Sequence, residues 1–209
     1  MSANPTLFYC PRTRSAIAGW MNEELGAPCD IKIVDIRNGE QDTPDYLAVN
    51  PMGKVPALVH DGVAVTEAAA ICAYLADAYA DKGLAPALSD PHRGAYYRWM
   101  FFAPACIEPA MLDKFTGVVR ENPASVGHGL VDDVLRAIDH ALEAGPFVLG
   151  DKFSAADVVF GSTLNFTTMF GAFEARPKWK DYLARLTSRP AFIASQEKDA
   201  ALAKELGLE

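Results

Sequence analysis

Cysteine is scarce in this sequence, and the spacing of the few cysteines fits neither a metal site nor a disulfide framework. The four are Cys10, Cys29, Cys72 and Cys106. Zinc sites and disulfide scaffolds repeat their cysteines at short, regular spacings, which is not the case here. Cys72 and Cys106 fall within apolar helical patterns, where a thiol packs as a small hydrophobic side chain. We therefore expect no metal and reduced cysteines, which favours a cytoplasmic location.

Long apolar runs and basic clusters are also missing. No run approaches the roughly 18–20 apolar residues of a membrane-spanning helix, and residues 1–5 do not begin a secretory signal. Lys and Arg number 19 against 27 Asp and Glu, which gives a net charge of −8. With no Lys/Arg stripe to bind phosphates, we expect neither a nucleic acid nor a membrane as a partner.

The first part of the chain alternates short apolar runs with one amphipathic segment. The hydrophobic fraction of 50% is enough for one or two buried cores. The patterns predict β-α-β and then β-β-α, with Thr66 as the N-cap of the last helix and Glu67 in its first turn. The predicted elements are strands at 6–9, 31–36, 55–60 and 63–65, helices at 14–25 and from 67, and a short helix near 44–49.

Everything after a Gly- and Pro-containing linker at 82–91 is predicted to be helical. An apolar stripe runs from Tyr96 to Ala110, and Pro104 and Pro109 should kink or end that helix. Ser154 and Asp157 form a variant of the capping box in front of a further apolar helix. The expected fold class is α+β, with an N-terminal domain at 1–82 and an all-α domain at 90–209.

The segment 50–58, Asn-Pro-Met-Gly-Lys-Val-Pro-Ala-Leu, carries the clearest functional signal. A proline that opens a strand can adopt the cis bond. A cis bond before Pro56 would turn the N–H and C=O of Val55 toward an extended peptide. The free N–H groups after Thr66 could hold a carboxylate, and Glu67 could hold an ammonium group. These features fit a ligand with a peptide backbone, an amino-acid end and a thiol.

Three motifs in order resemble those of the cytosolic glutathione S-transferase superfamily, over essentially the whole chain. They are the segment 50–58, the Thr-Glu-Ala-Ala-Ala-Ile segment at 66–71, and Gly-Asp-Lys-Phe-Ser-Ala-Ala-Asp at 150–157. The resemblance implies a thioredoxin-like β-α-β-β-β-α domain followed by an all-α domain. It also implies a homodimeric, bacterial-type detoxification enzyme that binds glutathione as co-substrate and requires no metal.

Carried over by residue, the resemblance implies five glutathione-binding positions. Val55 would bind the cysteinyl main chain, next to the cis Pro56. Glu67 and Ala68 would hold the γ-glutamyl end, and Lys54 would reach the glycyl carboxylate. Many relatives have Ser where this chain has Ala68, so one hydroxyl contact is lost. The plainer alternatives are that Pro56 only shapes a turn, Glu67 only complements a helix dipole, and Lys54 is a solvated charge.

Four residues near the first predicted helix are candidates for activating the glutathione thiol. A hydrogen-bond donor there would stabilise the thiolate, which is the nucleophile. Ser15 and Thr13 lie where related enzymes place their catalytic residue, Cys10 lies in a Tyr-Cys-Pro sequence similar to omega-type transferases, and Tyr9 lies at a strand end as in tyrosine-type classes. The beta-type cysteine position is occupied by Arg14, so the chain is not a plain beta-class enzyme.

The second substrate is expected to be a small hydrophobic electrophile or a peroxide that lies against the helical domain. The candidate wall residues are Tyr97, Trp99, Phe102 and Glu108. Conjugation, peroxidase and thiol-transferase chemistry all use the thiolate as nucleophile. Two other functions stay open: a non-catalytic binding or regulatory protein with this fold, and a glutathione-dependent isomerase or dehalogenase.

Overall fold

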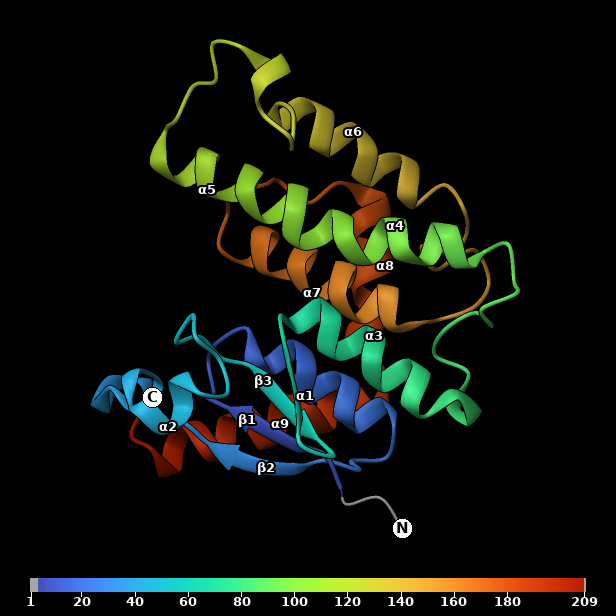
Figure 1. The fold of residues 1–209 in the computed structure, drawn as a ribbon. Coiled ribbons are helices and arrows are strands. Elements are labelled where there is room, and N and C mark those ends of the chain that lie inside the picture. Colours follow the sequence, from blue (N-terminus) through green and yellow to red (C-terminus); the bar gives the residue numbers. More distant parts are fainter. Residues whose placement is uncertain (1–3, 209) are drawn as a thin grey trace. The chain divides into compact units, whose positions relative to one another are not determined.

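The computed structural model describes residues 4–208, which form two compact units (Figure 1). The first unit runs through Lys82 and resumes at Ser188, whereas the second covers Gly83–Thr187. This division differs from the predicted ranges 1–82 and 90–209, because the last helix of the chain packs with the N-terminal unit. No helix between residues 4 and 208 has both the length and the apolar character needed to cross a bilayer.

The first unit is built on a mixed sheet with the strand order β2-β1-β3-β4. The strands are β1 (Thr6–Tyr9), β2 (Asp30–Ile33), β3 (Ala57–His60) and β4 (Val63–Thr66). β1 runs parallel to β2 and antiparallel to β3, and β4 is antiparallel to β3. The parallel β1-α1-β2 unit and the β3-β4 hairpin thus match the sequence prediction and give the thioredoxin-like α+β class.

Local residue chemistry accounts for the hairpin and for the first of two shifted boundaries. Asp61 and Gly62 both have positive φ, 48° and 79°, as a two-residue hairpin turn requires. The second strand ends at Ile33 rather than Ile36, because the side chain of Asp35 accepts a hydrogen bond from the N–H of Arg37 and begins a 3-10 turn. Thr66 ends β4 instead of capping a helix, and Glu67 takes the N-cap position.

The helices of the first unit lie against this sheet and against each other (Figure 1). α9 packs along α1, and α1 packs along α3. Trp20 and Met21 of α1 are fully buried, as the apolar spacing of that segment predicts. The helical elements are α1 (Ser15–Glu24), η1 (Ile36–Asn38), η2 (Glu40–Asp42), α2 (Pro44–Leu47), α3 (Ala68–Ala78), η3 (Ala80–Lys82) and α9 (Pro190–Glu205).

The second unit is helical throughout its regular structure. Its elements are α4 (Arg93–Phe102), η4 (Ala103–Ile107), α5 (Glu108–Thr116), η5 (Pro123–Ser125), α6 (Val131–Ala141), α7 (Ala155–Met169) and α8 (Pro177–Thr187). Pro104 and Pro109 do not end the helical path. A π-helical turn, η4, joins α4 to α5. Proline has no backbone N–H to donate, and the local change in hydrogen-bond pattern at η4 lets the helical path continue past both prolines.

Asp157 of α7 organises the core of the second unit. Its Oδ1 accepts hydrogen bonds from the Val148 N–H at 2.9 Å and the Tyr182 hydroxyl at 3.1 Å, and its Oδ2 accepts from the Ser154 N–H at 2.9 Å. Burial raises the pKa of Asp157 to about 6. The predicted capping box is therefore present, and it also connects α7 to α8.

We predict that Asp157→Ala lowers the free energy of unfolding by about 3 kcal/mol, because it leaves several buried donors without an acceptor. Urea titration of the full chain measures this change. Ser154→Ala is the matched control and should cost about 1 kcal/mol, the usual value for a lost N-cap side chain. Equal losses in the two variants would contradict a role for Asp157 beyond capping.

Candidate functional site

The strand register of the first unit brings the loop after β1, the segment before β3 and the start of α3 to one edge of the sheet. Ala57, at the start of β3, pairs with Phe8 of β1 on one side and with Thr66 of β4 on the other. β3 is antiparallel to both neighbours, so the segments that follow β1 and β4 and the one that precedes β3 leave the sheet at the same edge. These segments carry Cys10–Ser15, Glu67 and Val55.

Val55 presents an unpaired stretch of main chain at this edge. The peptide bond between Val55 and Pro56 is cis, and the β1-β3 ladder ends at Ala57. Across residues 4–208, no hydrogen bond involves the N–H or the C=O of half-buried Val55. An extended peptide could therefore use both groups as a partner strand does.

A small hydrogen-bond network holds the residue before Val55. The carbonyl oxygen of Lys54 accepts from the Tyr46 hydroxyl at 2.6 Å and from the Asn50 side-chain amide at 2.7 Å. Gly53 has a φ of 59°, and a Cβ there would lie 3.0 Å from an Asp42 carboxylate oxygen, so the position requires glycine. Neither Tyr46 nor Asn50 was predicted as a site residue. Asn50 opens the 50–58 segment, but its Asn-Pro pair indicates only a turn.

Glu67 holds an unusual backbone conformation at the start of α3. Its φ and ψ are 69° and 121°, and its side chain makes no capping bond. The first helical bond of α3 is donated by the Ile71 N–H to the Glu67 carbonyl at 2.9 Å, which leaves the N–H groups of residues 68–70 without partners in the structure. Such groups favour an anion, and a strained non-glycine residue points to a functional constraint.

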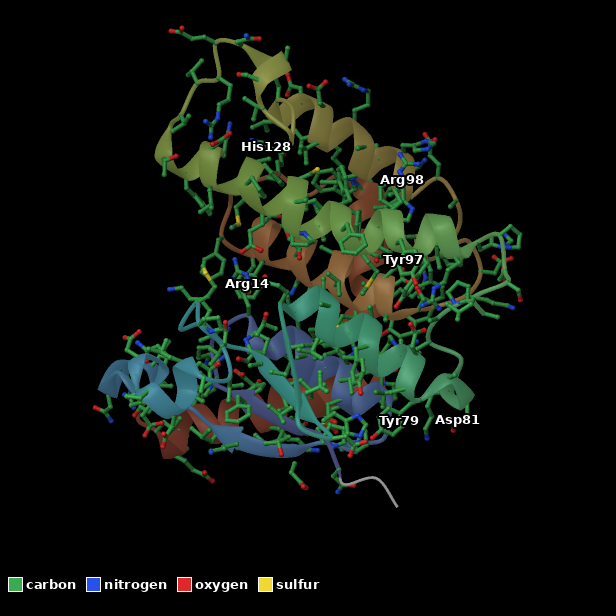
Figure 2. The ribbon with its side chains drawn as sticks, in the orientation of Figure 1. Arg14, Tyr79, Asp81, Tyr97, Arg98 and His128 are labelled. Atoms are coloured by element: carbon green, nitrogen blue, oxygen red, sulfur yellow. The ribbon has the colours of Figure 1, made fainter. Side chains whose placement is uncertain are left out.

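Thr13 and Ser15 form a hydroxyl chain in front of α1. The Thr13 hydroxyl lies 2.7 Å from the Cys10 carbonyl oxygen and 3.0 Å from Ser15 Oγ. Ser15 Oγ accepts from the Cys10 N–H at 3.2 Å, and Thr13 Oγ1 accepts from the Ser15 N–H at 3.1 Å. Ser15 is fully buried and Thr13 half-buried. Arg14, labelled in Figure 2, precedes the first helical residue of α1.

Tyr9 and Cys10 are both buried in the first unit. The Tyr9 hydroxyl donates to Asp199 of α9 at 2.6 Å, and burial followed by this bond raises the pKa of Tyr9 far above its usual value. Cys10 has only 1% of its surface exposed, and burial raises the pKa of its thiol as well. Tyr9 therefore remains a protonated phenol that donates its hydrogen bond to Asp199, and Cys10 remains a protonated thiol.

The aromatic candidates of the second unit have different environments. Trp99 is buried and packs edge-on against the rings of Phe102 and Phe160, so it is a core residue rather than a wall residue. Half-buried Phe102 stacks on Phe160. Tyr97 of α4, labelled in Figure 2, is exposed. The guanidinium of Arg93 lies over its ring.

Glu108 is half-buried in the first turn of α5, where a carboxylate complements the helix dipole. No group of three or more His, Cys, Asp or Glu side chains within the described part of the chain is placed to hold a metal ion.

Family models match both halves of the chain. The glutathione S-transferase N-terminal domain matches residues 14–78, and the glutathione S-transferase C-terminal domain matches residues 111–185. Among curated relatives, glutathione S-transferase GstA of Escherichia coli O157:H7 is 27% identical over 77% of this chain and 81% of its own. Glutathione S-transferase hmp2 of Hypomyces subiculosus is 29% identical over 87% and 92%, respectively.

Solved structures give the same result. A glutathione transferase homologue from Sulfitobacter, solved with bound glutathione, is 30% identical, has a TM-score of 0.73, and is matched over 94% of this chain and 98% of its own. A glutathione transferase from Methylococcus capsulatus is 29% identical with a TM-score of 0.75, over 94% and 99%. With both domains matched, the chain belongs to the glutathione S-transferase family, and its predicted enzyme class, glutathione transferase, is confirmed.

Proposed function

We propose that this protein binds glutathione at the sheet edge of its first unit and stabilises the thiolate for attack on a small hydrophobic electrophile. The observation that carries this proposal is the unpaired main chain of Val55 beside the free N–H groups at the start of α3. A γ-glutamyl tripeptide needs a partner strand for its middle residue and an anion site for its amino-acid end, and the two lie next to each other here.

In this assignment each part of glutathione has a partner. The Val55 N–H and C=O pair with the cysteinyl residue. The Ala68 N–H binds the γ-glutamyl carboxylate, and the Glu67 carboxylate binds the ammonium group. Ala68 offers only its backbone, but the helix N-terminus supplies further donors. Exposed Lys54 is left to reach the glycyl carboxylate.

Among the four candidate thiol activators, we propose Thr13. The Tyr9 hydroxyl already donates its hydrogen bond to Asp199, Cys10 is a buried thiol, and Ser15 is fully enclosed. Thr13 is half-buried, and its one proton already lies between two acceptors, the Cys10 carbonyl and Ser15 Oγ. A glutathione sulfur could accept this proton in their place. The thiol proton then passes to solvent, and the thiolate attacks the electrophile.

We further propose that the protein is a cytoplasmic homodimer. Two pairs of exposed apolar residues, Tyr97 with Phe101 in α4 and Leu112 with Phe115 in α5, each follow the spacing of one face of their own helix. Exposed apolar side chains of this kind favour burial against a second copy of the chain. The four free cysteines are compatible with a reducing compartment.

We predict that Thr13→Ala lowers kcat/KM for conjugation of chlorodinitrobenzene about 100-fold, the usual effect of losing a donor to a developing anion. Thr13→Ser keeps the hydroxyl and should retain most of the activity. Steady-state assays at fixed pH compare the three proteins. A wild-type kcat/KM in Thr13→Ala would show that another residue activates the thiol.

The buried state of Cys10 leads to a separate expectation. Cys10→Ala should leave both conjugation and any thiol-transferase activity within about twofold of wild type, because a buried protonated thiol is a poor nucleophile. Loss of thiol-transferase activity alone would identify Cys10 as the nucleophile of a second, reductive reaction.

Glutathione binding itself is tested with immobilised glutathione and by calorimetry. Glu67→Gln should raise the Kd for glutathione about tenfold, because one charge-assisted hydrogen bond to the ammonium group is lost. Glu205→Gln, at the end of α9, is the matched control and should leave the Kd unchanged. A wild-type protein that neither binds glutathione nor conjugates it would favour the non-catalytic alternative.

A further inference from the structure

We propose that Asp199 of α9 is a positioning residue for the thiol-activating loop Cys10–Ser15. This inference rests on the proposed function for its catalytic meaning, but its structural part does not. Asp199 is separated from the loop by almost the whole chain, and no sequence motif connects the two. The contact lies entirely within the first unit.

The Asp199 carboxylate binds two groups that frame the start of the loop. Its Oδ1 accepts from the Tyr9 hydroxyl at 2.6 Å and from the Arg12 N–H at 3.2 Å, and its Oδ2 lies 3.4 Å from the same N–H. Asp199 is 3% exposed, whereas the Arg12 side chain is 56% exposed. Arg12 Nε lies 3.9 Å from Asp199 Oδ2. The carboxylate therefore acts chiefly on the Arg12 main chain rather than on its guanidinium.

The position of Arg12 explains why this contact controls the loop. Arg12 has a φ of 62°, a conformation that a non-glycine residue rarely adopts without support. It directly precedes Thr13, whose hydroxyl bonds the Cys10 carbonyl. Asp199 thus fixes Tyr9, which precedes Cys10, and Arg12, which precedes Thr13. Together these set where the Thr13 hydroxyl lies.

Other contacts hold α9 on α1 independently of Asp199. Arg189 donates two hydrogen bonds of 2.7 Å to the Glu24 carboxylate, and Lys198 donates one of 2.7 Å to Glu23. Because these contacts involve neither the loop nor Tyr9, α9 should remain docked when Asp199 is replaced. The positioning role can therefore be separated from simple attachment of the helix.

The test compares Asp199→Ala and Asp199→Asn with Glu23→Gln, the matched control at a second α1-α9 contact. Hydrogen exchange at residues 12–15, the glutathione Kd, kcat and the pH profile of kcat/KM are measured for each full-length protein. Asp199→Ala should speed exchange at residues 12–15 about tenfold, because the Arg12 N–H loses its acceptor. It should also lower kcat about 30-fold and move the pH profile about one unit upward, with the Kd within about threefold.

Asn keeps an acceptor oxygen for Tyr9 and Arg12, so Asp199→Asn should restore kcat to within about threefold of wild type. Glu23→Gln should behave as wild type in all four measurements. Equal effects of Asp199→Ala and Glu23→Gln, or unchanged exchange in Asp199→Ala, would overturn the inference.

A second variant and a readout that does not depend on activity keep the outcome decisive. If Asp199→Ala does not fold, Tyr9→Phe removes one of the two donors and should speed exchange at residues 12–15 by a smaller factor; no change would overturn the inference. The exchange measurement requires no activity. A wild type without glutathione turnover would therefore contradict the proposed function alone, whereas unchanged exchange contradicts the positioning role.

Discussion

The arrangement of the site depends on one constraint, the pairing of Ala57 with both Phe8 and Thr66. A β-strand has a two-residue repeat, so a shift of one position in either ladder would turn Ala57 away from the core and separate the segments that now meet. Ala57 is fully buried, and Phe8 packs with it against Tyr46 and Val34. The hydrophobic core therefore fixes the register, and the register brings the loop after β1 to the same edge as Val55 and Glu67.

Around this edge, some polar groups have hydrogen-bond partners within the protein and others have none. The paired groups hold the structure, and the unpaired ones are available to a ligand. The Lys54 carbonyl accepts two hydrogen bonds, and the Tyr9 hydroxyl donates one to Asp199. Val55 and the first N–H groups of α3, in contrast, have no partner in the described structure. Buried backbone groups nearly always pair, so unpaired groups that converge on one edge favour a ligand that supplies the missing partners.

The sequence predicted those features that depend on neighbouring residues. The Asp61-Gly62 turn, the strand Thr6–Tyr9 and the cap at Asp157 each follow from local patterns. The boundary between Thr66 and Glu67 was wrong, because strand pairing with Ala57 extends β4 through Thr66. The sequence could not show which of Ser15 and Thr13 is the better candidate thiol activator, because the two differ in their burial in the folded loop. The placement of α9 depends on ion pairs such as Arg189 with Glu24, which periodicity does not reveal.

The buried polar contact between Asp199 and Tyr9 also bears on why α9 lies in one position along α1. An apolar contact between two helices tolerates small sliding movements, because one methylene replaces another at little cost. A carboxylate that must meet a hydroxyl and an N–H at the same time has one acceptable position, and leaving these groups unpaired would cost about 1–3 kcal/mol each. Buried polar pairs can specify register in this way. The ion pairs attach α9 to α1, and the Asp199 contact couples the register of α9 to the loop that we propose activates the thiol. The C-terminal segment is therefore part of the architecture of the proposed site.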